Sequence, residues 1–179
     1  MTRSRERIIA AGFELFETTP FKEVTVEDIL KKSYTSRGTF YRYFRDKYEL
    51  MNLYYSRFLN EDILSEFNGS NWKELQARCY KFGEENSYFF RNVKDTIGQN
   101  GFWDYLKDVS CAVFRDIKKH NAGRDTLTDE EEFIIQCYVE SAVFGFQQIV
   151  FSKTQLPAEK VSEIIYQMLP DDYKIYLPE

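Results

Sequence analysis

Two helix-start signals close together near the N-terminus constrain the fold of this chain more than any other feature. Thr25, followed three residues later by Asp28, forms a capping-box pattern that predicts a helix over about 26–32. Ser36 is a second candidate N-cap, in front of a short helix over about 37–44. Only about three residues separate the two helices, which is the layout of a helix-turn-helix unit.

Apolar residues recur at helical spacing through the rest of the chain and predict an all-α fold of about nine helices. A first helix is expected from Arg3 to about Thr18, before Pro20. Asp46 is placed to cap a long fourth helix that should reach Ile63. Further helices are predicted over 72–93, 102–119, 129–152 (capped by Thr128 with Glu131) and 158–169, with a broken connection at 96–101 and a polar loop at 120–128.

The composition is that of a globular helical protein without a membrane segment. Of its 179 residues 43% are hydrophobic and 30% charged, and the sequence has no apolar run near the ~20 residues of a bilayer span. The N-terminus carries no secretory signal, so a cytoplasmic protein is expected. The sequence has three cysteines without a CxxC motif and one histidine, His120, and this predicts neither disulfides nor a metal site.

Charge is distributed unevenly along the chain. Residues 1–47 contain ten Lys or Arg and seven Asp or Glu, a net charge of +3. Residues 48–179 contain 14 basic and 22 acidic residues, a net charge of −8. A basic N-terminal part on an acidic remainder fits contact of the first part with an anionic polymer.

The segment KKSYTSRGTFYRYFRDK, residues 31–47, concentrates this positive charge, with six basic residues and one acidic residue. If Phe40 and Phe44 pack inward, then Arg37, Tyr41 and Arg42 point outward at helical spacing. Arginines and hydroxyl groups on the second helix of a helix-turn-helix can read bases and hold phosphates. The alternative is that these side chains merely solvate a small helix; the cap, the short turn and the basic helix together favour DNA binding.

The run from Arg7 to Leu50 resembles the N-terminal domain of the TetR family of transcriptional regulators. The resemblance covers about a quarter of the chain in motif, and the helical layout of the remainder is similar to the family's ligand-binding and dimerisation domain. The matching residues are Ile8, Ala11, Phe16, Thr25, Val26, Ile29, Ser36, Gly38, Thr39, Phe40, Tyr41, Tyr43, Phe44, Lys47 and Leu50.

This resemblance implies a DNA-binding domain over residues 1–47 and a ligand-binding and dimerisation domain over 48–179. It also implies a homodimer, formed through the helices at about 129–152 and 158–169, on a near-palindromic double-stranded DNA operator. The DNA-contact candidates carried over from the motif are Thr25, Thr35, Ser36, Arg37, Gly38, Thr39, Tyr41, Arg42, Tyr43 and Lys47.

One position departs from the family pattern. Family members usually have small residues and a glycine in the turn, whereas this chain has Lys32, Ser33, Tyr34 and Thr35 there. A bulky residue in a left-handed conformation is strained, so Tyr34 implies either strain or a different turn geometry.

Aromatic residues are dense between Tyr80 and Phe114, where they could line a ligand pocket or fill a core. The pocket candidates are Tyr80, Tyr88, Phe102, Trp103, Tyr105, Phe114 and Tyr138. The leading interpretation is a repressor that responds to an unidentified small-molecule effector, without a cofactor. The alternative is a regulator or coactivator controlled by a protein partner, without a pocket. No catalytic constellation is recognisable in the sequence, so an enzyme is not expected.

Overall fold

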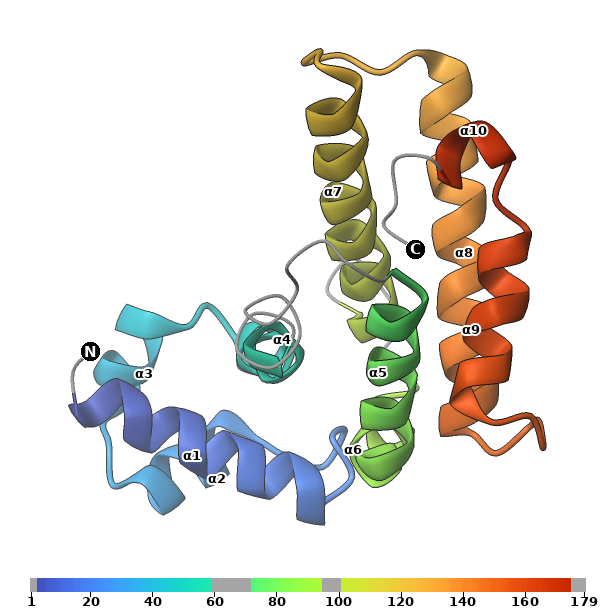
Figure 1. The fold of residues 1–179 in the computed structure, drawn as a ribbon. Helices are drawn as coiled ribbons and strands as arrows, with labels where there is room; N and C mark the ends of the chain where they lie inside the picture. Colours follow the sequence, from blue (N-terminus) through green and yellow to red (C-terminus); the bar gives the residue numbers. More distant parts are fainter. Residues whose placement is uncertain (1–2, 59–71, 95–100, 175–179) are drawn as a thin grey trace.

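The computed structural model of the chain describes residues 3–58, 72–94 and 101–174, and all regular secondary structure in these ranges is helical (Figure 1). The all-α prediction is confirmed. The helices are α1 (Arg3–Thr18), α2 (Val26–Ser33), α3 (Arg37–Tyr43), α4 (Lys47–Phe58), α5 (Trp72–Glu85), α6 (Ser87–Asn92), α7 (Phe102–Ala122), α8 (Asp129–Val150), α9 (Ala158–Gln167) and α10 (Asp171–Lys174).

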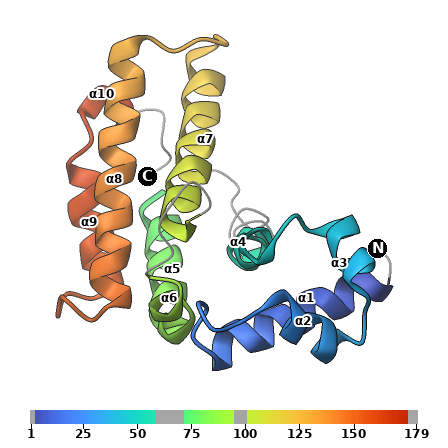
Figure 2. The ribbon, with the colours of Figure 1, turned by 180° about the vertical axis from the view of Figure 1, so that it is seen from behind.

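The helices form two groups, which we call the head (α1–α4) and the body (α5–α10). In the head, α1 packs against α2, α3 and α4. In the body, the long helices α7 and α8 lie side by side, and α5 packs against α8 and α9 (Figures 1 and 2). The groups meet where α1 packs against α6 and where α4 packs against α7.

The predicted helix starts are present in the structure. The Thr25 hydroxyl accepts a hydrogen bond from the Asp28 amide, and the Asp28 carboxylate accepts one from the Thr25 amide. The Thr128 hydroxyl and the Glu131 carboxylate make the same reciprocal pair at the start of α8. Each pair satisfies two backbone donors that helix geometry leaves free, which fixes where α2 and α8 begin.

The head is held together by a small aromatic and aliphatic core. Its fully buried members come from all four helices and the α1–α2 connection: Ile8, Ile9, Phe16, Phe21, Val24, Ile29, Phe40, Leu50 and Met51. Each such side chain stabilises the fold by about 1.5–3 kcal/mol. Helix α1 can approach α4 closely because position 12 is glycine, where an added Cβ would lie 2.4 Å from a methyl carbon of Leu50.

The single helix predicted over 72–93 is wrong, because the chain breaks it at Asn86 into α5 and α6. Asn86 has φ −103° and ψ 24°, outside the helical range. Its side-chain amide donates to the Phe82 carbonyl at 2.9 Å and accepts from the Tyr54 hydroxyl at 3.1 Å. An asparagine amide that bonds the backbone in this way competes with regular helix, and the partner Tyr54 lies on α4.

Other differences concern helix ends. Helix α7 continues to Ala122 and ends at Gly123, which has φ +64°, so the loop begins later than predicted and the exposed His120 lies in the last turn of the helix. Helix α9 ends at Gln167, and Pro170 separates it from α10. The expected continuation of α4 to Ile63 lies outside the described residues, as does most of the connection predicted at 96–101.

The Glu131 carboxylate links the start of α8 to α7 and to the α7–α8 loop. It accepts a hydrogen bond from Arg124, and its Oε1 lies 3.5 Å from the ammonium of Lys118, a buried residue of α7. The hydrogen bonds from Arg124 and from the Thr128 backbone lower the Glu131 pKa to about 2. A carboxyl with a depressed pKa stabilises the fold above its ordinary pKa of 4.5 and loses that contribution as the pH falls toward 2.

We predict that Glu131→Gln lowers the free energy of unfolding at pH 7 by about 1 kcal/mol, because glutamine keeps the cap but not the charged pairs. The difference from the wild type should shrink at pH 3. Urea unfolding followed by circular dichroism, at one protein concentration, measures both. Glu130→Gln in the same helical turn is the control and should cost less; a difference that stays constant between pH 7 and pH 3 would contradict the assignment.

Candidate nucleic-acid interface and apolar cavity

Helix α3 presents two faces of opposite character. Phe40 is fully buried and Phe44, at its C-cap, is 3% exposed, so these rings anchor the helix to the head. Arg37 and Arg42 are exposed, and Tyr41 is 50% exposed. The outer face of α3 therefore carries two guanidinium groups and a phenol, which are groups that hydrogen-bond to base edges and phosphates.

Hydroxyl groups surround the N-terminus of α3. The Ser36 hydroxyl accepts from the Thr39 amide at 3.2 Å and lies 2.9 Å from the Thr39 hydroxyl. The Thr35 hydroxyl lies 2.8 Å from that of Ser33, which is buried. Ser36 is exposed and Thr35 and Thr39 are half-buried, so the cap holds three hydroxyls at one edge of the outer face.

Thr25 and Tyr43 are more constrained than the other candidates. The Thr25 hydroxyl donates to the Asp28 carboxylate at 2.6 Å while accepting from the Asp28 amide, so its first task is to cap α2. These hydrogen bonds lower the pKa of Asp28 and keep the partner carboxylate ionised. Tyr43 is half-buried, and it packs against the core of the head.

The structure gives Lys47 a different role from the phosphate contact expected from its sequence position. Its ammonium group donates to the carbonyls of Phe21 and Val24 at 2.8 and 2.6 Å and lies 4.4 Å from the centre of the Phe21 ring. Burial lowers the Lys47 pKa, with Asp28 opposing that shift. We therefore assign Lys47 to joining α4 with the α1–α2 connection.

Two basic residues of segment 31–47 are paired with carboxylates of other helices, besides Arg45, whose Nε lies 3.6 Å from the carboxylate of its neighbour Asp46. Arg37 bonds Glu27 of α2, and the Lys32 ammonium lies 2.5 Å from a carboxylate oxygen of Glu14 in α1. The four side chains are 36–64% exposed. Exposed pairs contribute only about 0–1 kcal/mol, so a phosphate can replace either carboxylate at little cost.

Gly38 lies in α3 on its exposed side. Among the described residues, a Cβ added there would meet nothing outside its own helix and chain neighbours within 4 Å, so no described neighbouring helix requires glycine at this position. Glycine within a helix costs about 1 kcal/mol relative to alanine. Close packing within the described part of the chain therefore does not account for this glycine.

Tyr34 has a left-handed backbone, with φ 52° and ψ 46°. Its amide donates to the Leu30 carbonyl and ends α2, as a glycine in this position would. Of the two alternatives for this turn, a strained backbone at Tyr34 and a different turn geometry, the structure has the strained backbone. The left-handed conformation costs an ordinary residue roughly 1–2 kcal/mol.

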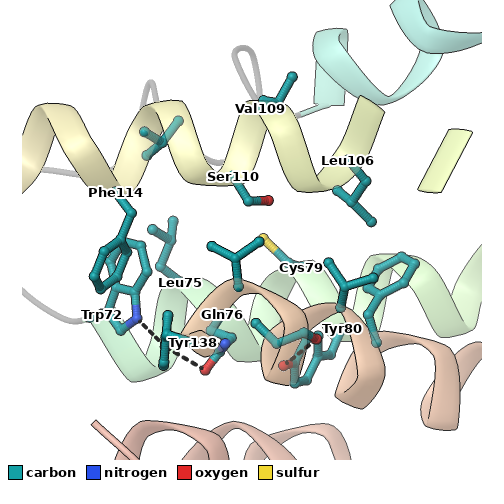
Figure 3. Close-up of a pocket in the computed structure, with 15 residues that line it drawn as sticks. Trp72, Leu75, Gln76, Cys79, Tyr80, Leu106, Val109, Ser110, Phe114 and Tyr138 are labelled. Carbon is teal, nitrogen blue, oxygen red and sulfur yellow. Dashed lines mark hydrogen bonds between the residues drawn. The ribbon is translucent and has the colours of Figure 1, made fainter. Parts of the chain in front are cut away.

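The body contains an apolar cavity of about 110 Å³ between α5, α7 and α8 (Figure 3). Leu106, Ser110 and Phe114 point into it from α7, facing α5 and α8. No charged side chain is among the described residues that line it. They are Trp72, Leu75, Gln76, Cys79, Tyr80, Leu106, Val109, Ser110, Val113, Phe114, Tyr138, Val139, Ala142, Val143 and Phe146.

Of the seven aromatic residues predicted to line a pocket, Tyr80, Phe114 and Tyr138 do so. The other four are placed elsewhere. Tyr88 is exposed, and Phe102 is fully buried against Phe89 and Phe90. Trp103 packs on Phe146 and Phe151. Tyr105 faces a groove between head and body.

The candidates predicted from the sequence were all aromatic, so they did not include the small and polar residues that line the cavity. On α5 the lining falls at Trp72, Leu75, Gln76, Cys79 and Tyr80, the spacing of one helical face. That periodicity, compared with the matching face of α7, is the signal that could have identified them.

Hydrogen bonds hold the cavity walls in place. Trp72 donates to the Tyr138 hydroxyl at 2.7 Å, and that hydroxyl lies 3.4 Å from the Gln76 side-chain oxygen. The Tyr80 hydroxyl donates to the Ala142 carbonyl at 2.9 Å. Burial raises the pKa of both tyrosines, so they remain neutral donors. The amide of Gln76 and the hydroxyl of Ser110 are also among the polar groups of the lining residues.

Possible metal ligands and the apolar helix α8 also bear on function. No group of three or more His, Cys, Asp or Glu residues there could hold a metal ion. Helix α8 is long and apolar enough to cross a membrane by length and composition alone, a test that the core helices of soluble proteins also pass. It packs against α5, α7 and α9, and its first turn carries four acidic residues, as expected of a core helix.

A helix-turn-helix whose second helix turns basic and hydroxyl groups outward, carried on an acidic helical body, defines a DNA-binding protein of the helix-turn-helix class. Comparisons with known proteins specify the family. Residues 8–53 match the family described as bacterial regulatory proteins, tetR family, and residues 70–171 match a family described as transcriptional regulator C-terminal region.

Individual relatives agree with this assignment. An uncharacterised HTH-type transcriptional regulator, YdgC of Bacillus subtilis, is 26% identical over 184 residues, which cover 93% of each chain. The HTH-type dhaKLM operon transcriptional activator DhaS of Lactococcus lactis is 25% identical over 89 residues, about half the length of either protein. Among solved structures, a TetR regulator from Rhodococcus sp. RHA1 has a TM-score of 0.64 at 17% identity, covering 96% of this chain and 98% of that one.

This chain belongs to the TetR family of transcriptional regulators. Members of the family bind DNA operators and typically dimerise. The relatives are transcriptional regulators and not enzymes, which confirms the expectation that the chain is not an enzyme.

We predict that Gly38→Ala raises the free energy of unfolding by up to about 1 kcal/mol, because alanine favours helix and meets no atom of the chain. The same change should weaken DNA binding if the exposed face of α3, which would carry the added methyl group, meets DNA as expected. Urea unfolding and fluorescence anisotropy with a bound duplex measure the two effects. Gly123→Ala is the matched control: its φ of +64° makes alanine strained, so it should lose stability and keep DNA affinity. Unchanged DNA binding by Gly38→Ala would contradict the proposed role.

Proposed function

We propose that the chain is a homodimeric repressor that binds a near-palindromic DNA operator through α3 and is released by a small apolar ligand in the α5–α7–α8 cavity. The observation that carries the proposal is the outer face of α3. Arg37, Tyr41 and Arg42 are displayed on a helix that Phe40 and Phe44 hold rigidly in the head. A rigid support lets exposed side chains meet base edges in a fixed register.

Contacts to DNA divide by chemistry. We assign Arg42 and Arg37 to guanine or phosphate, since a guanidinium group can bond guanine O6 and N7 together. Ser36, Thr39 and Tyr41 are suited to phosphate contacts beside the α3 N-terminus. Thr35 lies beside the same cap, Gly38 is on the exposed side of α3, and Thr25 supports the motif by capping α2, while Tyr43 is partly buried against the head.

Dimerisation is supported by exposed apolar side chains on α8 and α9. Phe133 is 67% and Phe144 59% exposed, and they lie about three turns apart on one side of α8. On α9 and just beyond it, Ile164 is 39% and Met168 62% exposed. Large apolar side chains gathered on neighbouring helices mark a surface that associates, and a second copy presents the same surface.

Hydrogen bonds join the body to the head, one of them beside the cavity. Tyr105, next to the lining residue Leu106, bonds the Ser56 hydroxyl of α4. In α6, Asn92 donates to the Phe16 carbonyl of α1 at 3.3 Å. Ligand binding that displaces α5 or α7 would therefore move the head.

The junction at Asn86 adds a further link between α4 and the body. Burial, assisted by the nearby Glu17 carboxylate, raises the pKa of Tyr54 to about 12, so its hydroxyl remains a donor to Asn86 at neutral pH.

Because half-sites on DNA lie about 34–36 Å apart, a change in the separation of two heads would release the operator.

The presence of an apolar cavity favours ligand control over the alternative of control by a protein partner. Repression is proposed as the mode because a bound dimer can block a promoter by occupancy alone. The relative DhaS is named as an activator, so a reporter assay with the selected operator should distinguish the two modes.

We predict that selection from random duplex DNA recovers a palindrome, whose half-site spacing reports a dimer. Arg42→Ala should weaken binding to that duplex at least tenfold and make the salt dependence shallower, while helical content stays unchanged. Lys153→Ala removes a positive charge from the α8–α9 connection and is the control. Wild-type affinity in Arg42→Ala would show that α3 is not the reading helix.

We predict that neutral aromatic fragments about the size of phenol raise the unfolding midpoint and weaken operator binding. A cavity of about 110 Å³ is close to engineered cavities that hold benzene. Ser110→Phe should fill the cavity and abolish both responses. Ala112→Phe, on the exposed side of the same helix, should retain them. Fragments that act equally on the wild type and Ser110→Phe would place their site elsewhere.

A further inference from the structure

Tyr34 combines two features that the chain itself does not explain. It is one of two non-glycine residues with positive φ among the described residues, the other being Ser152. Its side chain is 86% exposed, the largest value among the large hydrophobic residues that are described as exposed. The position therefore holds a strained backbone and a large side chain that buries almost no surface.

No contact of the side chain within the described residues offsets the strain. The backbone hydrogen bond from Tyr34 to Leu30 closes α2, but that bond uses the amide alone, and glycine would make it without strain. The phenol makes no hydrogen bond within the part of the chain that the structure describes. A conformation kept in spite of its cost points to a role outside the folded chain.

The location of Tyr34 identifies the partner. The residue lies directly before the Thr35–Ser36 cap of α3 and after the exposed Lys31 and Lys32 at the end of α2. The α2–α3 connection is on the side of the head away from the body (Figures 1 and 2). When the N-terminal part of a recognition helix enters the major groove, the residues just before it stand at the groove wall, where the phosphates are.

We propose that Tyr34 contacts the DNA backbone beside the operator major groove, with its hydroxyl donating to a phosphate oxygen and its ring packing on the adjacent sugar. This inference rests on the proposed operator binding. The contact positions α3 and is independent of base identity, because phosphate and sugar are the same at every base pair. A phenol is neutral, so the contact should release no counterion and leave the salt dependence unchanged.

The test compares Tyr34→Gly and Tyr34→Phe with the wild type on the selected duplex and on an unrelated duplex. Tyr34→Gly relieves the strained backbone, so its urea midpoint should rise while its dissociation constant increases about tenfold on both duplexes. The slope of affinity against salt should stay at the wild-type value. Tyr34→Phe should keep the wild-type midpoint and weaken binding by a smaller factor. Tyr88→Phe, at an exposed tyrosine of α6, is the matched control and should change nothing.

Each other outcome overturns the inference in a distinguishable way. If the wild type selects no duplex, operator binding itself fails, and this contact fails with it. If Tyr34→Gly binds as tightly as a wild type that does select an operator, only the Tyr34 contact fails. A loss confined to one base pair of the operator would make Tyr34 a base reader, and full affinity in Tyr34→Phe would exclude the hydrogen bond to phosphate.

Discussion

A continuous series of ring contacts joins the head to the body, and the arrangement of the remaining helices depends on it. Tyr54 of α4 meets Phe13 of α1 edge to face and stacks on Phe89 of α6, with ring centres 4.9 and 4.2 Å apart. From Phe89 the series continues through Phe90 and reaches α7 and α8 at Phe102 and Phe146. Edge-to-face packing of this kind restricts rotation as well as burying apolar surface, so the orientation of the head is coupled to the body.

The same rings explain why the sequence identified the head better than the cavity. Helix caps depend on residues three positions apart, and Thr25 with Asp28 and Thr128 with Glu131 could therefore be identified from local pattern. Whether an aromatic ring faces a cavity or fills the core depends on helices far away in sequence. Phe102 is core because Phe89 and Phe90 cover it, and nothing near position 102 encodes that contact.

Asn86 and Lys47 illustrate the same limit at single residues. Asn86 breaks a helix at the point where Tyr54, on another element, donates a hydrogen bond to its side-chain oxygen. Lys47 faces inward because the carbonyls of Phe21 and Val24, in the α1–α2 connection, lie close to the start of α4 and accept hydrogen bonds from its ammonium group. Of the six basic residues in segment 31–47, the protein without DNA therefore uses Lys47 for internal structure and holds Arg37, Lys32 and Arg45 in surface ion pairs. Charge counts along a sequence overestimate the charge available to a partner.

The dimensions of the body cavity have a consequence for how a signal would reach this protein. The described residues around this cavity of about 110 Å³ include no charged side chain, so an ion buried there would lack a partner among them. Small neutral molecules that fit this cavity also dissolve in the apolar interior of a lipid bilayer. If the proposed effector binds there, it could therefore reach the protein by crossing a bilayer without a transporter.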